Sequence, residues 1–331
     1  MIEAPHDYVV YGAPISLFTR KLEAAMRFYR APHTLVAKQP QAADEVAMRS
    51  GTHQVPVLHT PDGWMIADTT PILDLLDARF PARRLFPPGP LGVLVHVVEE
   101  ILDEWFARTM VHYRWHYDEN TRHVVSKILG REVSIEEARA FPVAKWGPRA
   151  CRATGTESEH QQRAVEREYL ALVDALERQL ATTRYALGDR PTAVDAILLG
   201  GLRAHTNSDP VPDLSAYSRV LAWDASDADA WSGDGTLAAF PGSTPFVAHV
   251  LAVGRDCYAP FLLGNAEALA AGAKSFVVKT YGEDVSYLAR PYPERSRQML
   301  KARIRDRLDP AEQKSVLAWL DAHGLAECFR P

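Results

Sequence analysis

Two short segments of this chain carry the residues best suited to holding a small peptide. Residues 54–58 have the sequence QVPVL. A proline inside such an apolar run removes a donor from the strand ladder, so the run belongs at a strand edge, a strand start or a special turn. If the bond between Val55 and Pro56 is cis, the backbone of Val55 is exposed for pairing with a peptide. Asp68 and Thr69 precede a predicted helix, whose N-terminus favours a carboxylate. Together the segments predict a site for a small peptide that carries an α-carboxylate.

Histidines and cysteines offer weaker signs of chemistry. His112 and His116 lie one helical turn apart, a spacing that can hold a metal ion. No acidic partner for them is identifiable in the sequence, so we interpret them as a surface or pocket pair and predict no metal site. The three cysteines, Cys151, Cys257 and Cys328, lie far apart without CxxC spacing. That arrangement indicates packing or surface residues rather than ligands or redox centres.

The composition is that of an ordinary globular protein and argues against several classes of partner. The 331 residues are 47% hydrophobic and 24% charged, with a formal net charge of −5. Lysines and arginines are scattered, so no nucleic-acid partner is expected. The N-terminal residues lack the basic start and apolar core of a signal peptide. Acidic residues interrupt the longest helical pattern, residues 91–117, so no membrane span is expected either. The cytoplasm is the expected compartment.

Strand and helix patterns alternate over residues 1–86 and predict a small sheet covered by helices, which is a first α/β domain. A proline-rich linker at residues 86–90 follows it. The expected elements are strands at 8–11 and 33–37, a hairpin within 55–67, and helices at 18–30, 42–49 and 70–79.

Beyond the linker the strand signals almost vanish, and residues 91–331 are expected to form an all-helical domain. Segment 119–155 is harder to assign, apart from a helix near 134–140. The pattern of Thr192 and Asp195 is that of a capping box, to which we give the structural role of starting a buried helix. The other helices are expected at 91–117, 157–181, 192–205, 215–223, 245–271, 293–307 and 310–323.

Three segments, in this order, resemble the glutathione S-transferase superfamily. Residues 11–21 (YGAPISLFTRK) are similar to the strand, loop and helix that open its thioredoxin-like domain. Residues 54–58, with Asp68 and Thr69, are similar to its cis-proline strand and acid–hydroxyl pair, and residues 187–195 (LGDRPTAVD) to a buried capping motif of its helical domain. The resemblance implies a thioredoxin-like α/β domain followed by a larger all-α domain of the glutathione S-transferase C-terminal kind, with glutathione as cofactor. The C-terminal region is longer than usual in the family.

Ser16 lies where the family places its thiol-activating residue. The resemblance implies that the Ser16 hydroxyl donates a hydrogen bond to the glutathione sulfur and favours the thiolate. A two-unit fall in a thiol pKa needs about 2.7 kcal/mol. One hydrogen bond to a charged acceptor gives about 1.5–3 kcal/mol, and a helix N-terminus about 0.3–1 kcal/mol. The alternative is a plain N-cap serine. A serine cannot form the mixed disulfide of cysteine-bearing relatives, so redox activity is not expected.

The resemblance also implies a contact for each part of the tripeptide. The backbone of Val55 would pair with the cysteinyl unit, and Gln54 would contact the glycyl end. Asp68 would bind the ammonium group of the γ-glutamyl end, and Thr69 its carboxylate. The alternatives are an edge strand whose proline, Pro56, supports only the fold, and simple N-capping by either residue of the acid–hydroxyl pair. The family more often has Glu-Ser at that pair.

A second-substrate pocket is expected between the two domains, where small-molecule sites often lie. Tyr113, Arg114 and Tyr117, at the end of the first long helix, are the candidates for lining it. Arg20 and Lys21 are interpreted as a solvated start of the first helix, with a position facing the thiol as the alternative for Arg20.

These inferences predict a cytoplasmic glutathione-dependent transferase or lyase, in which a thiolate stabilised by Ser16 attacks a small hydrophobic electrophile. The alternative is a non-catalytic member of the superfamily that serves in binding or assembly, and a third, weaker option is a carrier of apolar ligands. Many relatives form homodimers, so a homodimer is a possible assembly.

Overall fold

The first domain contains a four-stranded mixed sheet with the strand order β2-β1-β3-β4. The computed structural model describes residues 2–37, 40–226 and 228–331. In it β1 pairs parallel with β2 and antiparallel with β3, and β3 pairs antiparallel with β4. The parallel pair confirms the expected crossover through the first helix. The strands are β1 (Tyr8–Gly12), β2 (His33–Ala37), β3 (Val57–His59) and β4 (Met65–Ala67).

Three helices accompany this sheet: α1 (Leu17–Tyr29), α2 (Pro40–Ser50) and α3 (Thr69–Arg79). The apolar spacing along α1 predicts one buried face, and Leu22 and Met26 on that face are fully buried. The elements of the first domain therefore form in the predicted order, with ends that differ from the predicted ones by a few residues.

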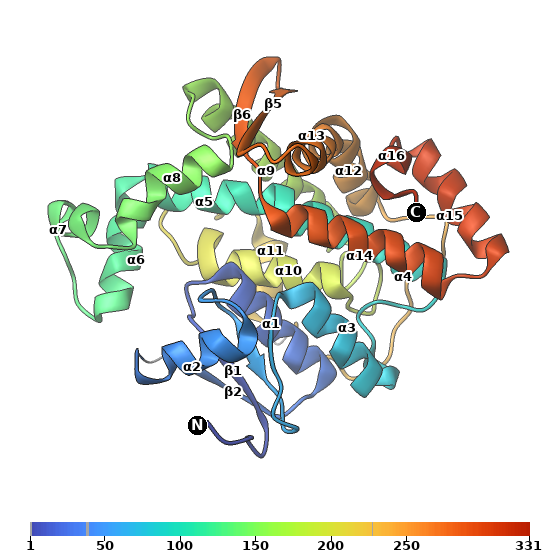
Figure 1. Cartoon of the computed structure of the whole chain (residues 1–331), viewed down its shortest axis with the longest axis horizontal. Coiled ribbons are helices and arrows are strands. Elements are labelled where there is room, and N and C mark those ends of the chain that lie inside the picture. The colour runs from blue at the N-terminus through green and yellow to red at the C-terminus, as the bar shows by residue number, and fades with distance from the viewer. Residues whose placement is uncertain (1, 38–39, 227) are drawn as a thin grey trace.

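A larger helical domain lies above the first domain in Figure 1. Its first long helix runs from α4 through a π-helical segment, Ile101–Phe106, into α5, as the pattern at 91–117 predicts. The predicted order of a thioredoxin-like domain and a larger helical domain is thus confirmed. The helices are α4 (Pro90–Glu100), α5 (Ala107–His116), α6 (Asp118–Leu129), α7 (Ile135–Ala140), α8 (Gly147–Ala153), α9 (Glu159–Gln179), α10 (Ala193–Gly201), α11 (Ser218–Ala225), α12 (Pro245–Val253), α13 (Ala259–Ala270), α14 (Pro291–Arg307), α15 (Pro310–Ala322) and α16 (Ala326–Phe329).

The second domain is not entirely helical, because an antiparallel hairpin of β5 (Ser275–Thr280) and β6 (Glu283–Leu288) lies between α13 and α14. The sequence does contain a signal for it, a glycine between two short runs that contain valine and aromatic residues. Burial alternates along β5, and the two-residue turn of Tyr281 and Gly282 has φ angles of 50° and 87°. Two successive positive φ values are typical of the tight turns that join hairpin strands. The expectation of an all-helical region was wrong at this point.

The two domains share one hydrophobic core, and α1 packs against α10 across their junction. Gly200 permits this close approach, because an added Cβ there would lie 2.8 Å from the carbonyl oxygen of Leu17 and 2.8 Å from the backbone nitrogen of Lys21. The predicted capping box starts α10, with the backbone nitrogen of Thr192 donating to the buried carboxylate of Asp195 at 2.8 Å. This helix therefore forms a buried spine that supports the first domain.

Lys21 is not part of a solvated helix start, so that expectation was wrong. Its side chain is fully buried, and its ammonium group pairs with the carboxylates of Glu99 and Asp103, the latter at 2.6 Å. Arg20 is partly exposed, and its Nε donates to the carbonyl oxygen of Pro14 at 3.0 Å. The prediction failed for Lys21 because both of its partners come from the other domain.

One helix among the described residues is long and apolar enough to cross a membrane, namely Pro245–Ala270, which comprises α12, a π-helical turn and α13. Half (50%) of its apolar window is buried inside the protein. Phe246 and Leu262, near its two ends, are fully buried. Burial of this kind is the pattern of a core helix.

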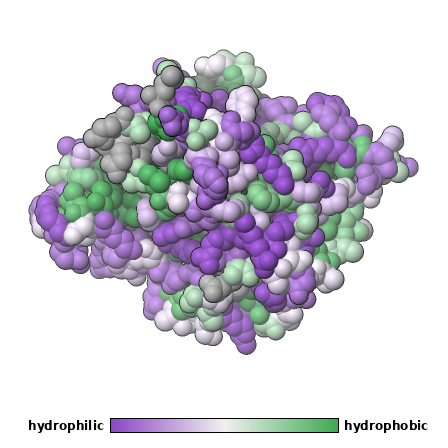
Figure 2. Space-filling model, turned by 90° about the horizontal axis from the view of Figure 1, so that it is seen from below, coloured by the Kyte–Doolittle hydropathy of each residue, from purple (hydrophilic) through white to green (hydrophobic). Residues whose placement is uncertain are grey.

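The surface seen from below is a mosaic, with hydrophilic residues across its middle and hydrophobic residues gathered toward the left (Figure 2). The stretch from α6 to α8 holds three of the exposed large hydrophobic side chains, and the others are scattered over separate elements. Scattered exposure of this kind is normal for a folded protein. Among the described residues these exposed side chains are Met48, Trp64, Ile128, Leu129, Trp146 and Val277.

Candidate functional site

A cavity of about 220 Å³ is lined by residues of both domains, and its lining includes all five of the residues predicted to bind the cofactor. These five come from the segment before β3 and from the start of α3. Its other walls are formed by α1, the π-helical segment, α5 and the start of the α14 region. The lining residues are Phe18, Thr52, Gln54, Val55, Pro56, Ala67, Asp68, Thr69, Asp103, Glu104, Ala107, Arg108, Val111, Thr154, Arg290 and Tyr292.

The peptide-pairing edge has the geometry that the sequence predicts. The bond between Val55 and Pro56 is cis. Strand β3 begins only at Val57, and the backbone N–H and C=O of Val55 have no partner among the described residues. Pro56 is buried, whereas Gln54 is exposed at the mouth of the cavity. An unpaired backbone beside a cavity is available to an extended peptide ligand.

Asp68 adopts a backbone conformation that is rare for a residue with a side chain, with a φ of 73°. Such a conformation costs about 1–3 kcal/mol and is typical of functional sites. The Asp68 side chain makes no capping hydrogen bond to α3, although Asp68 precedes that helix. Burial raises the pKa of its carboxyl above the ordinary value, the charge of Asp103 adds to the rise, and Lys21 opposes it. The Asp68 carboxyl lines the cavity, and the nearby backbone N–H of Thr70 opposes the rise in its pKa.

Thr69 is the first residue of α3 and is almost fully buried, with 3% of its surface exposed. At this position the helix dipole and the backbone N–H groups of Thr69 and Thr70 favour a carboxylate. Pro71 has no N–H, and the Ile72 nitrogen donates to the Asp68 carbonyl oxygen at 3.3 Å. A carboxyl group at Asp68 and a helix N-terminus at Thr69 thus lie on adjacent residues in one cavity. This pair fits the α-ammonium and α-carboxylate groups of an amino acid.

Ser16 is the N-cap of α1, and its Oγ accepts a hydrogen bond from the backbone nitrogen of Thr19 at 3.4 Å. An accepting hydroxyl keeps its own proton for donation, and no acceptor for that proton is found among the described residues. Ser16 is not among the residues that line the cavity, whereas Phe18 is. Ser16 is thus two residues before the cavity-lining Phe18 in the sequence, and the role that the structure shows for it is the N-cap of α1.

The charged wall of the cavity was missed by the sequence analysis. Asp103 and Glu104 come from the π-helical segment, Arg108 from α5, and Arg290 from the residue before α14. Arg108 is 2% exposed, and its Nη2 donates to the Glu168 carboxylate at 3.2 Å, whereas its Nε and Nη1 have no partner among the described residues. Asp103, Glu104 and Arg108 are charged residues within one largely apolar helical pattern, but nothing in the local sequence shows that they share a cavity with Arg290.

The three residues predicted to line a second-substrate pocket lie elsewhere. Arg114 is buried, pairs with Asp209 at 2.9 Å and donates to the carbonyl oxygen of Ile15 at 2.6 Å. Tyr113 is 3% exposed, and the Tyr117 hydroxyl donates to a carboxylate oxygen at 2.8 Å. None of the three belongs to the lining of the cavity described above. Arg114 instead supports the loop that leads to Ser16.

The histidine pair has an acidic partner that the sequence did not reveal. The rings of His112 and His116 stack with their centroids 4.8 Å apart, and His112 Nε2 lies 2.7 Å from the carboxylate of Glu166. Burial lowers the pKa of His112, and the hydrogen bond to Glu166 opposes that shift. Among residues 2–37, 40–226 and 228–331, no three histidine, cysteine or acidic side chains are grouped so that they could hold a metal ion.

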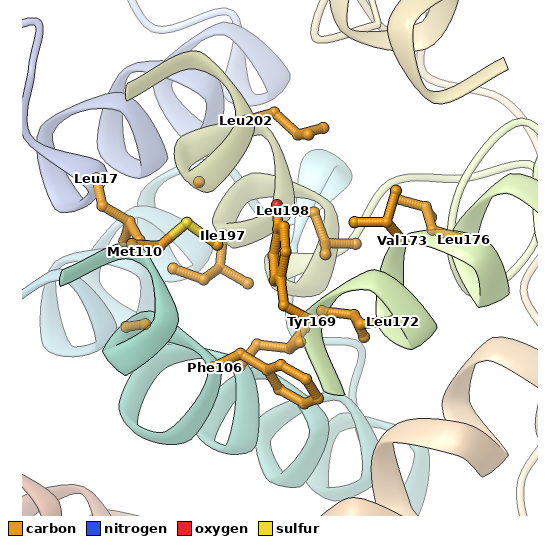
Figure 3. A pocket seen from close by; sticks show the side chains of 13 residues that line it. Leu17, Phe106, Met110, Tyr169, Leu172, Val173, Leu176, Ile197, Leu198 and Leu202 are labelled. Carbon is orange, nitrogen blue, oxygen red and sulfur yellow. The ribbon is translucent and has the colours of Figure 1, made fainter. Parts of the chain in front are cut away.

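A second, apolar cavity lies at the junction of the domains (Figure 3). Leu17 enters it from α1, Met110 from α5 and Tyr169 from α9, while Ile197 approaches from α10. Ala107 lines both this cavity and the larger one. Its volume is about 30 Å³, compared with about 220 Å³ for the larger cavity. It is therefore a packing space behind the site rather than a substrate pocket.

Family models match parts of both domains. A family model described as the glutathione S-transferase N-terminal domain matches residues 10–84, and a model described as the glutathione S-transferase C-terminal domain matches residues 159–223. No curated protein sequence matches the chain significantly.

Solved structures show weaker likeness. A glutathione S-transferase from Rhodospirillum rubrum F11 is 17% identical with a TM-score of 0.46, over 73% of this chain and 99% of that one. One from Methylobacterium radiotolerans JCM 2831, in complex with glutathione sulfonate, is 21% identical with a TM-score of 0.43, over 72% and 99%. One from Methylobacillus flagellatus KT, with glutathione bound, is 16% identical with a TM-score of 0.42, over 66% and 93%. These scores are too low to carry an argument about the site.

Proposed function

Because the chain belongs to the glutathione S-transferase superfamily, with family models matching its first domain and the front of its helical domain, we propose that it is a glutathione-dependent transferase or lyase. Glutathione would occupy the 220 Å³ cavity, with its thiol as the reacting group. The observation that carries this proposal is the convergence of Gln54, Val55, Pro56, Asp68 and Thr69 on one cavity, although two separate segments contribute them.

Each end of the tripeptide finds complementary groups in this arrangement. The ammonium of the γ-glutamyl end would bind the Asp68 carboxylate, and its carboxylate would bind at Thr69 and the first turn of α3. The cysteinyl backbone would pair with the unpartnered backbone of Val55, and the glycyl end would extend toward Gln54. The ligand would thus be held at both ends, with its thiol between them.

Ser16 would then stabilise the thiolate. Its Oγ accepts from the backbone nitrogen of Thr19, and the remaining O–H is able to donate to the sulfur. One such bond contributes about 1.5–3 kcal/mol, and the N-terminus of α1 about 0.3–1 kcal/mol. Together they are enough to lower the thiol pKa by about two units.

A small hydrophobic electrophile would approach from the apolar side of the cavity. Phe18, Ala107 and Val111 supply apolar surface to the same cavity as the cofactor groups. Holding the electrophile against the thiolate makes the reaction effectively intramolecular. The lone pair of the sulfur forms the new sulfur–carbon bond, and in a substitution the leaving group departs with its bonding electrons.

The second candidate function is a non-catalytic binding or assembly protein with the same fold. The observation that favours it is the position of Ser16, which caps α1 and does not line the cavity. This candidate would retain the fold without activating a thiol.

A titration of glutathione with an ultraviolet readout of the thiolate tests the proposal. It compares the wild type with Ser16→Ala and, as a matched control, Ser134→Ala. Ser134 is also a helix N-cap, with its hydroxyl accepting from Glu137 nitrogen at 3.2 Å, but it lies on α7. The thiolate signal should be lost in Ser16→Ala alone. Binding without a thiolate signal in the wild type would favour the second candidate.

A further inference from the structure

The cavity wall includes two residues from the part of the chain that lies beyond both family matches. Arg290 and Tyr292 line the same cavity as Asp68 and Thr69, whereas the family models end at residues 84 and 223. Arg290 immediately precedes α14 and follows the hairpin of β5 and β6. The C-terminal extension therefore contributes a cation to the proposed glutathione site.

The backbone of Arg290 is held rigidly by a buried amide. Asn265, which is fully buried on α13, accepts from the Arg290 nitrogen at 2.8 Å and donates to the Arg290 carbonyl oxygen at 3.0 Å. The guanidinium carbon lies 5.7 Å from the centre of the Phe261 ring. A cation that is positioned before a ligand arrives loses little freedom on binding.

Buried contacts also fix α14 against the rest of the protein. The Glu100 carboxylate accepts from the Tyr258 hydroxyl at 2.5 Å and from the hydroxyl of Ser296 on α14. Further along the helix, the guanidinium of Arg303 pairs with Asp74 on α3. The extension is thus an integral part of the fold, and its first turn has a defined place beside α3.

The start of α14 lies beside the start of α3. Glu294 and Arg295 on the first turn of α14 share a surface hollow with Asp68 and Pro71 at the start of α3. The extension therefore meets the cavity at the Asp68 end. The apolar side of the cavity, near Val111, comes from α5.

The guanidinium of Arg290 has capacity for an additional anion. Its Nη2 lies 3.4 Å from the carboxylate of Glu104, at the outer limit of hydrogen-bond reach, and its Nε has no hydrogen-bond partner among the described residues. The side chain is 32% exposed. A guanidinium offers five N–H donors, of which this contact occupies at most one.

We propose that Arg290 binds the α-carboxylate of the γ-glutamyl end of glutathione, together with Thr69 and the N-terminus of α3, while Asp68 binds the adjacent ammonium group. This inference rests on the proposed function. The Glu104 carboxylate lies 3.4 Å from the guanidinium of Arg290, and the Asp68 carboxyl lines the same cavity. This mixture of signs fits a zwitterionic amino-acid end better than it fits an ion of one sign. The extension thereby completes the site within a single chain.

The test is a calorimetric titration with two ligands, glutathione and the analogue that lacks only the α-carboxylate, γ-aminobutyryl-cysteinylglycine. The proteins are the wild type, Arg290→Gln, Arg290→Lys and the matched control Arg305→Gln. Arg305 lies on the exposed side of α14 and pairs with Asp306. Thermal melts of all four proteins check that they are folded.

Arg290→Gln should weaken glutathione binding about 10- to 100-fold, the range for a lost hydrogen bond to a charged group. It should leave the affinity for the analogue unchanged. Arg290→Lys should retain part of the affinity for glutathione, and Arg305→Gln should bind both ligands like the wild type.

Two results would overturn the inference while leaving the proposed function in place. In the first, the wild type binds glutathione and Arg290→Gln binds it equally well. In the second, Arg290→Gln weakens both ligands to the same extent, which would mean that Arg290 supports the shape of the cavity without binding the carboxylate. Failure of the wild type to bind glutathione at all would instead overturn the proposed function, and this inference with it.

Discussion

Replacing Lys21 with methionine should destabilise the protein strongly, because it would leave two buried carboxylates without their cation. Glu99 is fully buried, and the side chain of Asp103 is 10% exposed. Removing one partner of a buried ion pair costs about 3–5 kcal/mol, a large share of the ~5–15 kcal/mol by which folded proteins are stable. Methionine keeps the length and apolar stem of the side chain, so lost packing contributes little.

The stability lost in Lys21→Met should depend on pH in a defined direction. Burial raises the pKa of the Glu99 carboxyl to about 7, although the charge of Lys21 lowers it. Without Lys21 that pKa should rise further. A carboxyl whose pKa is higher in the folded state than in the unfolded chain binds more protons when folded, so the variant gains stability as pH falls. The difference from the wild type should therefore be larger at pH 8 than at pH 5.5.

Urea denaturation followed by tryptophan fluorescence at these two pH values measures the effect. Arg20→Met is the matched control, because Arg20 is the neighbouring residue on α1 and its ion pair with Glu23 is partly exposed. Arg20→Met should lower the free energy of unfolding by less than about 1 kcal/mol at either pH. A loss below about 1 kcal/mol for Lys21→Met, or an equal loss at both pH values, would refute the account of a buried ion cluster.

Two further substitutions test the junction of the domains. Gly200→Ala should destabilise the protein by about 1–3 kcal/mol, because overpacking would push α1 away from α10. Gly201→Ala should be neutral or stabilising by up to ~1 kcal/mol, because its Cβ would meet only the Cε and Sδ of Met110, at 3.6 and 3.9 Å. Equal denaturation midpoints for the two variants would contradict this reasoning. Asp195→Ala should cost about 2–5 kcal/mol, because it leaves the buried backbone nitrogens of Ala186 and Thr192 without the acceptor they now have at 2.8 Å. A change in its midpoint no larger than that of Asp309→Ala, at the exposed cap of α15, would refute that role.

The parts of the fold that sequence reasoning predicted are those set by local patterns. The start of α10 follows from a capping box within four residues, and the Val55–Pro56 turn follows from one proline in an apolar run. The hairpin turn at Tyr281 and Gly282 was equally local, with a glycine between two short runs that contain valine and aromatic residues as its signal. It was missed because the surrounding region was dominated by helical patterns.

The charged groups of the site could not be predicted in the same way. Lys21 pairs with carboxylates 78 and 82 residues away, and Arg290 reaches the cavity from the far end of the chain. No local pattern distinguishes such a lysine or arginine from a solvated one. For Arg114 the prediction erred in the other direction, from a pocket residue to a core residue. Its sequence neighbours suggested that it lines a pocket, whereas its ion pair with Asp209 holds it in the core. Tertiary packing decides these positions.

The central claim is that the cavity holds glutathione with its γ-glutamyl ammonium on Asp68. Calorimetric titration of glutathione into the wild type and into Asp68→Asn tests it most directly, because asparagine keeps the size of the side chain and removes only its charge. The account predicts measurable binding by the wild type and an affinity about 10- to 100-fold lower for Asp68→Asn. The absence of binding to the wild type at millimolar glutathione, or equal binding by both proteins, would contradict it.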